Sequence, residues 1–271
     1  MAETLLLCVD IGNTNTVLGI YKGKQLQHHL RIESRRYSTV DEYAALVHML
    51  LHQRGLALAG LQQAVIGSVV PQLTRVFEEV CRRGIGKTPV IIGPGTRTLM
   101  QILIDNPREV GADRIVNAIA AFEQYKQGCI VVDFGTATTF DVINSKGQYL
   151  GGVIAPGIGI SADALFTRAA KLPRVEISRP PSVLGKSTVL AIQSGLVFGY
   201  VSLVEGLVSR LKAELNEPAT VIATGGLAPL IARETTCITA ISEFLTLEGL
   251  RLVFERNNEE QTERIVLRRN H

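Results

Sequence analysis

The stretch DIGNTNTV at 10–17 and its counterpart DFGTATTF at 133–140 decide the fold. Each stretch follows an apolar run typical of a buried strand, and each leads into a second strand-like run that ends near a Lys-Gly turn. A motif that returns with the same neighbours indicates a duplicated structural unit. We therefore predict two copies of one domain, joined by a helix over 111–125.

The order of elements around the two stretches supports this duplication. The first copy is expected to begin with three strands at 5–11, 16–21 and 25–32. A helix capped by Ser38 or Thr39 follows and runs to residue 54. A strand at 64–69, a helix at 71–84 and a strand at 90–93 complete this copy. The second copy is expected to contain strands at 129–133, 138–143, 148–154 and 220–224, the last flanked by helical segments. The predicted fold class is α/β, with an N-terminal domain at 1–110, a linking helix at 111–127, a C-terminal domain at 128–255 and a tail at 256–271.

Composition excludes several classes of protein. The 271 residues are 46% hydrophobic and 20% charged, which excludes a disordered chain. A net charge of +3 gives no sign of a nucleic-acid or membrane partner. The N-terminus has no basic segment, and Asp10 interrupts its apolar run, so we expect a cytoplasmic protein. The cysteines are expected to be free thiols because they are far apart; they are Cys8, Cys81, Cys129 and Cys237.

The duplicated stretches have the composition of anion-binding loops. Gly12 and Gly135 permit tight turns, and backbone amides with small polar side chains can surround phosphate oxygens. The polar side chains are those of Asn13, Thr14, Thr16, Thr136, Thr138 and Thr139. Asp10 and Asp133 would repel a phosphate unless a cation lay between them and it. For one copy alone an ordinary hairpin turn is the better explanation, but two copies in equivalent places reverse that preference and favour phosphate binding.

Two other segments are candidates for ligand contact. VIATGGLAP at 221–229 runs from a strand through Gly225 and Gly226 into a helix, which lets a flat ligand approach the backbone; a plain turn is the alternative. GADR at 111–114 places Asp113 and Arg114 in the first turn of the linking helix. Those side chains could simply balance the helix dipole and make a surface ion pair. Their position between the two copies favours a ligand site.

Other motifs fail on their context. GKT at 86–88 lacks the earlier glycine of a P-loop and is followed by Pro89 and a strand, and GKS at 185–187 has Pro180 in the place of that glycine. GIGISA at 157–162 matches a dinucleotide fingerprint, but no clear βαβ unit completes it. His48 and His52 have no third metal ligand nearby in the sequence, and no Ser-His-Asp or Cys-His motif supports hydrolysis.

The run 189–208 predicts a helix that is apolar on nearly every side, since only Gln193, Ser194, Ser202 and Glu205 are polar. A membrane span is disfavoured by Gln193 and Glu205. Gly195 and Gly199 are four residues apart, which would allow two helices to approach closely. We therefore expect a homodimer that buries this helix.

Five ordered motifs resemble the type III pantothenate kinases, a family in the superfamily of actin, hexokinase and acetate kinase. They are DIGNTNTVLG at 10–19, DNPREVGADRIVNA at 105–118, VDFGTATTFDVI at 132–143, GGVIAPGI at 151–158 and ATGGLA at 223–228. The resemblance runs from Cys8 to about Leu250. It implies a ribonuclease-H-like fold in each half, ATP between the halves, and phosphorylation of pantothenate as the first step of coenzyme A synthesis.

The resemblance also implies roles for particular residues. Asp113 would be the base, Asp133 would help to hold potassium or ammonium, and Asp10 would bind the Mg that accompanies ATP, through water. The implied ATP-binding residues are Asp10, Ile11, Gly12, Asn13, Thr14, Asn15, Thr16, Val17, Thr136, Gly225 and Gly226. The implied pantothenate-binding residues are Ile104, Gly111, Ala112, Asp113, Arg114 and Thr188, although members often carry Tyr in place of Ile104. We further expect the helix N-terminus to keep the pKa of Asp113 low.

Two other functions stay open from the sequence. Relatives of the family include a Bordetella accessory factor named for gene regulation, so a non-catalytic ATP-binding regulator of the same fold is one alternative. An NAD-dependent dehydrogenase is another, and it depends only on the segment 157–162. Asp113 favours the enzyme.

Overall fold

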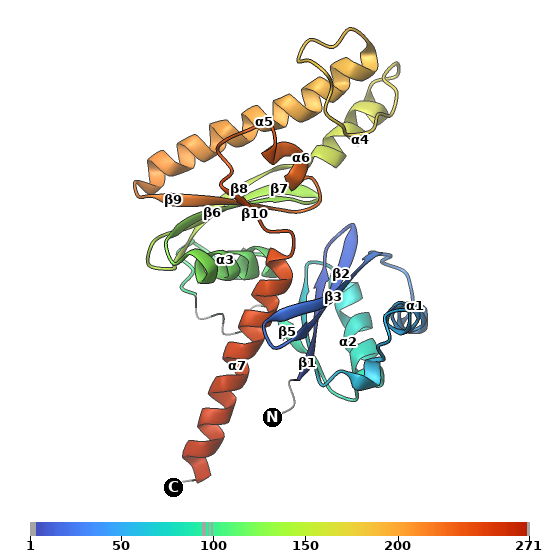
Figure 1. The fold of residues 1–271 in the computed structure, drawn as a ribbon, viewed down its shortest axis with the longest axis vertical. Coiled ribbons are helices and arrows are strands. Elements are labelled where there is room, and N and C mark those ends of the chain that lie inside the picture. The colour runs from blue at the N-terminus through green and yellow to red at the C-terminus, as the bar shows by residue number, and fades with distance from the viewer. Residues whose placement is uncertain (1–3, 94–95, 97, 99, 270–271) are drawn as a thin grey trace. The chain divides into compact units, whose positions relative to one another are not determined.

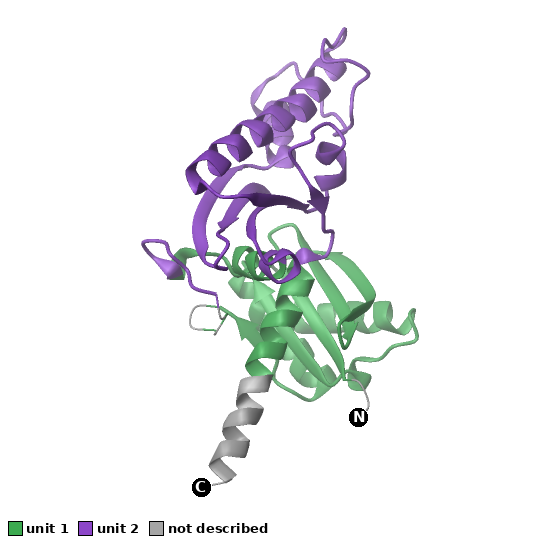
Figure 2. Cartoon of the chain, turned by 60° about the vertical axis from the view of Figure 1, so that its left-hand side comes forward, with its two compact units in different colours: residues 1–99, 108–120, 246–271 green, residues 100–107, 121–245 purple. Residues whose placement is uncertain are grey.

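The computed structural model describes residues 4–93, 96, 98 and 100–269. The chain forms two compact units, shown in Figure 2. Unit 1 comprises residues 1–99, 108–120 and 246–271, and unit 2 comprises residues 100–107 and 121–245. Each unit therefore contains segments that are far apart in the sequence.

The strands alternate with helices in a similar order in both halves of the chain, with two helices between β8 and β9 where the first half has one α-helix (Figure 1). The first half contains β1 (Leu5–Ile11), β2 (Asn15–Lys22), β3 (Gln25–Glu33), α1 (Val40–His52), β4 (Gln63–Ser68), α2 (Pro71–Ile85) and β5 (Val90–Ile92), with 3-10 turns at Leu58–Gly60 and Pro107–Glu109. The remainder contains α3 (Ala112–Tyr125), β6 (Gly128–Phe134), β7 (Ala137–Ile143), β8 (Tyr149–Pro156), α4 (Ile158–Arg168), α5 (Thr188–Leu215), β9 (Ala219–Thr224), α6 (Ala228–Ala232), β10 (Ala240–Ile241) and α7 (Leu245–Arg269).

The two sheets have the same topology. The strand order is β3-β2-β1-β4-β5 in unit 1 and, read in the matching direction, β8-β7-β6-β9-β10 in unit 2. In each sheet the first three strands are antiparallel, and the remaining pairs are parallel. The predicted α/β fold of two duplicated ribonuclease-H-like domains is confirmed.

In unit 1 the alternation of side chains along β1 divides the sheet into two faces. Leu7, Val9 and Ile11 pack in one apolar core with Tyr43 of α1 and Phe77 of α2. Cys8, one residue out of phase, is fully buried on the other face. The sheet is therefore covered on both sides.

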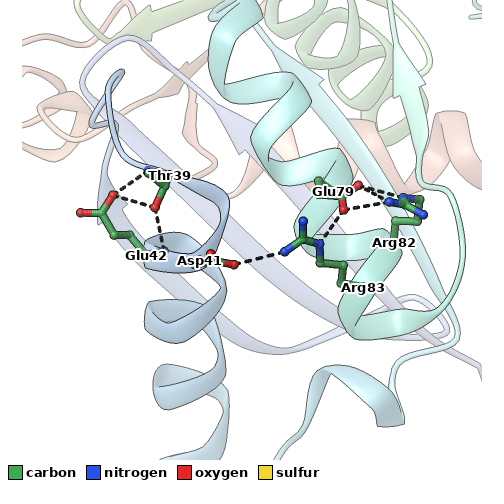
Figure 3. Close-up of polar contacts among 6 residues, drawn as sticks. All are labelled: Thr39, Asp41, Glu42, Glu79, Arg82 and Arg83. Carbon is green, nitrogen blue, oxygen red and sulfur yellow. Dashed lines mark hydrogen bonds and ion pairs between the residues drawn. The ribbon is translucent and has the colours of Figure 1, made fainter.

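Polar contacts fix the two outer helices of unit 1 (Figure 3). Thr39 and Glu42 form a capping box at the start of α1, as the sequence predicts for Thr39. Asp41 of α1 lies 3.1 Å from Arg83 of α2, and Glu79 also binds Arg83 at 2.5 Å. These pairs are largely exposed, so the shared apolar core contributes more of the packing energy than they do.

Helix α7 covers the other face of the unit 1 sheet. A Cβ on Gly19 of β2 would lie 2.7 Å from Leu247, and a Cβ on Gly67 of β4 would lie 2.7 Å from Leu250. The two glycines therefore let the helix approach the strands closely. The helix continues through the segment after 255 that the sequence treats as a tail.

A buried charge anchors the same helix. The Arg251 side chain is 2% exposed and pairs with Glu248 and Glu255, while its guanidinium lies 5.8 Å from the ring centre of Tyr21. Burial raises the pKa of Tyr21, so the ring stays a neutral partner for the cation. An arginine with two carboxylates can be buried because its charge is matched.

In unit 2, α5 lies across one face of the sheet (Figure 1). Ile130 and Val132 of β6 share an apolar core with Ile192, Leu196 and Val204 of α5. Against the other face, the end of α3 contributes the carbonyl of Ala121, which lies 3.8 Å from Sγ of Cys129. One side of α5, which contains the apolar run at 189–208, therefore packs in the core of unit 2.

Besides α7, three helices differ from the sequence predictions. Helix α4 occupies the segment considered as a dinucleotide fingerprint, and α5 continues to Leu215. Helix α2 ends at Ile85 rather than Gly84, because Gly86 adopts φ +77° and caps it. Within the described part of the chain, α5 alone has the length and apolarity of a membrane span, with a mean hydropathy of 1.5, a test that core helices also pass.

Candidate functional site

Loop 1, residues 12–15, connects β1 to β2 at the centre of the unit 1 sheet. Ile11 and Thr16 form the last strand pair before it, and the N–H of Gly12 donates to the carbonyl of Asn15 at 3.0 Å. The side chains of Asn13, Thr14 and Asn15 are exposed. Loop 1 therefore presents three polar side chains at the end of a buried strand.

Not every residue of the first motif reaches the surface. Thr16 is fully buried, and its hydroxyl lies 2.8 Å from the hydroxyl of Ser34. Ile11 is also fully buried, whereas Asp10 and Val17 are half-buried. The Thr16 hydroxyl thus ties β2 to the end of β3 rather than facing a phosphate.

Loop 2, residues 135–137, is the counterpart of loop 1 in unit 2. It is one residue shorter, because Phe134 pairs directly with Thr138. The N–H of Gly135 donates to the carbonyl of Ala137 at 3.1 Å. Thr138 therefore occupies the buried place of Thr16, and Thr136 is the exposed hydroxyl of loop 2.

Gly157 packs closely against the backbone of loop 2. A Cβ on Gly157 would lie 2.7 Å from the carbonyl oxygen of Gly135 and closer still to that of Thr136. No larger residue fits there unless loop 2 moves. In the sequence Gly157 belongs to the dinucleotide fingerprint at 157–162 and to the motif at 151–158, and neither pattern signals its packing role.

The Gly-Gly turn after β9 lies against the end of β6, directly before loop 2. Gly225 has φ +91°, and a Cβ on it would lie 2.8 Å from Oδ1 of Asp133 and 2.7 Å from the carbonyl oxygen of Phe134. Gly226 is exposed at the start of the following turn. The structure thus brings together the predicted residues Asp133, Thr136, Gly225 and Gly226 in unit 2.

Asp10 and Asp133 occupy equivalent positions in the two sheets. Asp10 pairs with Gly67 and Val17, and Asp133 pairs with Thr224 and Thr139. Among the described residues, no group of three His, Cys, Asp or Glu side chains could hold a metal. A divalent ion at either aspartate would therefore take most of its ligands from phosphate and water, as Mg does in many kinases.

The GADR segment lies next to the end of β1 in unit 1. The N–H of Val69 donates to the carbonyl of Ile11 at 3.0 Å. A Cβ on Gly111 would lie 3.8 Å from Val69 and would overlap the carboxylate of Asp113. Gly111 thus leaves room for the Asp113 carboxylate, and Val69 links this turn to loop 1.

Asp113 is less acidic than the sequence predicts. Its Oδ1 accepts the backbone N–H of Arg114 at 2.9 Å, an interaction that favours the charged carboxylate. Burial has the larger effect and raises the pKa of Asp113 above its usual range, with Arg114 lowering it only partly. The expectation that the helix N-terminus keeps this pKa low is therefore wrong, because desolvation outweighs the hydrogen bond.

The other predicted substrate residues are divided between the units. Ala112 is buried and Arg114 half-buried in α3 of unit 1. Ile104 belongs to unit 2, where a Cβ on Gly151 would lie 3.5 Å from it. Thr188 is the exposed first residue of α5, after the N-cap Ser187.

The sequence did not identify the partners of loop 1 on the segment after β3. The N–H of Ser34 donates to the carbonyl of Thr14 at 2.9 Å, and Nη2 of Arg36 donates to Oδ1 of Asn13 at 2.9 Å. These contacts are long-range in sequence, and only the antiparallel register of β2 and β3 brings them together.

Comparison with known proteins agrees with this geometry. The family model of type III pantothenate kinase matches residues 6–210. A type III pantothenate kinase of Moorella thermoacetica is 55% identical over 253 residues, covering 93% of this chain and 100% of that protein. Those of Anaeromyxobacter dehalogenans and Geobacillus kaustophilus are 56% and 52% identical, over 93% and 95% of this chain and 100% of each relative.

Solved structures support the fold alone. A Campylobacter jejuni protein described as a Baf family transcriptional activator aligns with a TM-score of 0.61 at 18% identity, over 93% of this chain and 99% of its own. A Sinorhizobium meliloti protein described as a 2-dehydro-3-deoxygalactonokinase aligns with a TM-score of 0.54 at 13% identity, over 93% and 96%. The family model and the relatives above half identity show that this chain, with its two Asp-x-Gly loops and its GADR turn, belongs to the type III pantothenate kinase family.

Proposed function

We propose that this chain transfers the γ-phosphoryl group of ATP to pantothenate, giving 4'-phosphopantothenate in the first step of coenzyme A biosynthesis. The family supports this reaction over a non-catalytic regulator. The structural observation that carries it is the approach of the GADR turn to Val69: a Cβ on Gly111 would lie 3.8 Å from Val69, whose N–H donates to the carbonyl of Ile11 at the end of β1. It sets a carboxylate of raised pKa beside a loop with the features of a phosphate site.

Asp113 is assigned the role of general base. The pantothenate hydroxyl oxygen forms a bond to the γ-phosphorus, the bond from that phosphorus to the bridging oxygen of ADP breaks, and the hydroxyl proton passes to Asp113. A raised pKa makes the carboxylate a stronger proton acceptor. Because phosphoryl transfer has a loose transition state, the proton can leave late, and positioning contributes most of the acceleration.

The two loops are assigned to the phosphates of ATP, and the Gly225-Gly226 turn to its adenosine. Asp10 would hold Mg through water, and Asp133 would hold potassium or ammonium. These ions would neutralise phosphate charge. Among the described residues, neither aspartate belongs to a group of three metal-binding side chains, which fits ions that keep phosphate and water ligands.

One assay tests the reaction directly. ADP release is measured with Mg-ATP, with and without pantothenate, in potassium, ammonium and sodium salts. Pantothenate-dependent ADP release is expected in potassium or ammonium. No ADP above background in any salt would reject the kinase function.

Asp133→Ala is expected to weaken the activation by potassium, because it removes the carboxylate proposed to hold the cation. Initial rates are measured across potassium concentrations at saturating ATP. The control is Asp163→Ala, which removes an exposed carboxylate and should keep the wild-type potassium response. Asp141 does not serve as a control because it is fully buried. An unchanged potassium dependence in Asp133→Ala would contradict the assignment.

A cytoplasmic homodimer built on α5 is also proposed. The helix carries small residues on its uncovered side, and a Cβ on Gly195 or Gly199 would meet nothing within 4 Å. Its polar residues already bind within unit 2: Gln193 donates to Ser178 at 2.8 Å, and Glu205 accepts from Thr235 at 2.7 Å. A second copy of α5 could approach this face closely.

Gly199→Leu is expected to weaken dimerisation and to lower activity with it, because a bulky side chain separates the two helices. Lys212→Leu adds the same side chain at an exposed position elsewhere on α5 and should leave assembly unchanged. Sedimentation velocity and ADP release are measured on the same samples. A wild-type protein that is monomeric and fully active at micromolar concentration would refute the dimer.

A further inference from the structure

The segment 34–36 after β3 is joined to loop 1 at two points and to Thr16 of β2 at a third. The N–H of Ser34 donates to the carbonyl of Thr14 at 2.9 Å, and the hydroxyls of Ser34 and Thr16 lie 2.8 Å apart in a buried position. The second contact to loop 1 runs from Nη2 of Arg36 to Oδ1 of Asn13 at 2.9 Å. Hydrogen bonds therefore hold loop 1 and the segment 34–36 together.

A buried tyrosine holds the segment from the other side. The hydroxyl of Tyr43 accepts the N–H of Arg35 at 2.7 Å and lies 3.1 Å from the carbonyl of Glu33, to which it donates. Tyr43 is 2% exposed, and its ring centre lies 4.8 Å from that of Phe77 in the core. The backbone that carries Arg36 is thus fixed before any ligand binds.

Two neighbouring arginines on this segment differ in how their charge is balanced. Nε of Arg35 lies 2.8 Å from a carboxylate oxygen of Glu33. Arg36 contacts the neutral amide of Asn13, and among the described residues no ion pair joins Arg36 to a carboxylate. Its positive charge lies at the exposed tip of loop 1 and is not cancelled there.

A guanidinium in this place suits the triphosphate of ATP. It offers several N–H donors in a planar fork that matches phosphate oxygens, and it keeps its charge at every physiological pH. Loop 1 supplies neutral amides and hydroxyls, and Asp10, which precedes it in β1, is an acid, so a cation from the protein would complete the site. We propose that Arg36 is an ATP-binding residue that contacts the phosphates at loop 1, an assignment that rests on the proposed kinase function.

Nucleotide binding tests this assignment without turnover. Calorimetry measures the affinity of the full-length protein for Mg-ATP, inorganic tripolyphosphate and adenosine at several salt concentrations. Arg36→Gln should weaken Mg-ATP and tripolyphosphate by about 10- to 100-fold and leave adenosine unchanged. It should also make the affinity for ATP less dependent on salt, whereas Arg36→Lys should keep the salt dependence because it keeps the charge.

Two controls separate a phosphate contact from a support for the loop. Arg35→Gln makes the same substitution at the neighbouring residue, whose charge is already paired with Glu33. This variant should bind ATP as the wild type does. Asn13→Ala removes the contact to Arg36 but no charge, so its salt dependence should match the wild type. Thermal melting verifies that each variant is folded.

The outcomes separate this assignment from the kinase function. Arg36→Gln and Arg36→Lys variants that bind ATP with wild-type affinity and salt dependence would overturn the role of Arg36, whatever the turnover. An equal loss of adenosine binding would overturn it too, since that marks general damage to the site. A wild type that shows the expected binding pattern but releases no ADP with pantothenate would instead reject the kinase function alone.

Discussion

Asp113→Asn is expected to lower kcat for pantothenate phosphorylation by about 10²- to 10⁴-fold, while the affinity for ATP stays close to that of the wild type. The amide keeps the size of the carboxylate and can still accept the N–H of Arg114. It cannot take the hydroxyl proton. ADP release gives kcat, and calorimetry gives the ATP affinity. Exposed Asp41→Asn on α1 makes the same chemical change and should leave both unchanged.

The same variant should be at least as stable as the wild type at neutral pH. Burial raises the pKa of Asp113 in the folded state, so the folded state holds this proton more tightly than the unfolded state does. Its free energy of unfolding therefore falls as the pH rises from the unfolded pKa through the folded pKa. Asp113→Asn removes that dependence. Urea unfolding of both proteins across this range measures the difference.

Turnover of the wild type should follow the opposite trend with pH. The base is active only when ionised, so kcat should fall as the pH drops through the raised pKa of Asp113. Near-normal turnover in Asp113→Asn would show that the carboxylate only stabilises the first turn of α3 and is not the base.

Gly157→Ala is expected to lower kcat/KM by about 10²-fold, because a methyl group there would displace loop 2 by roughly 1 Å. The new Cβ would overlap the carbonyl of Thr136 and lie 2.7 Å from that of Gly135. Both carbonyls are backbone atoms, so no side-chain rotation relieves the contact. Overpacking should also reduce the free energy of unfolding by about 1–3 kcal/mol.

Gly159→Ala is the matched control for this prediction. It makes the same change two residues later, in α4, where a Cβ would meet nothing within 4 Å. Alanine should stabilise that helix by about 0.5–1 kcal/mol. Kinetics and thermal unfolding of the two variants are compared under one condition. Equal activities would show that Gly157 does not position loop 2.

Local patterns in the sequence are sufficient to predict most of the fold. The apolar runs before Asp10 and Asp133 gave both central strands, and the capping residue Thr39 gave the start of α1. The repeated Asp-x-Gly motif gave the duplication, which the matching strand orders confirm. Each of these signals lies within about ten residues of the element that it predicts.

Features that depend on tertiary contacts could not be predicted from local patterns in the sequence. Helix α7 was missed because its buried Arg251 sits among acids that look like a solvated surface. The ungapped match of the two motifs aligned Thr16 with Thr139, whereas the strand register aligns it with Thr138. The pKa of Asp113 depends on how deeply α3 packs, and the helix position alone suggested the wrong direction.

The return of α7 to unit 1 has a consequence for how the protein is made. The first sheet emerges from the ribosome early, but one of its faces is covered by Leu247 and Leu250, which are translated last. The 146 residues between positions 99 and 246 take about 7 to 30 s to translate at bacterial and eukaryotic speeds. During that delay the nascent N-terminal unit exposes an apolar surface that the chain itself cannot yet cover. A folding factor that shields growing chains would therefore act on this half of the protein, and release from the ribosome would be closely coupled to completion of its core.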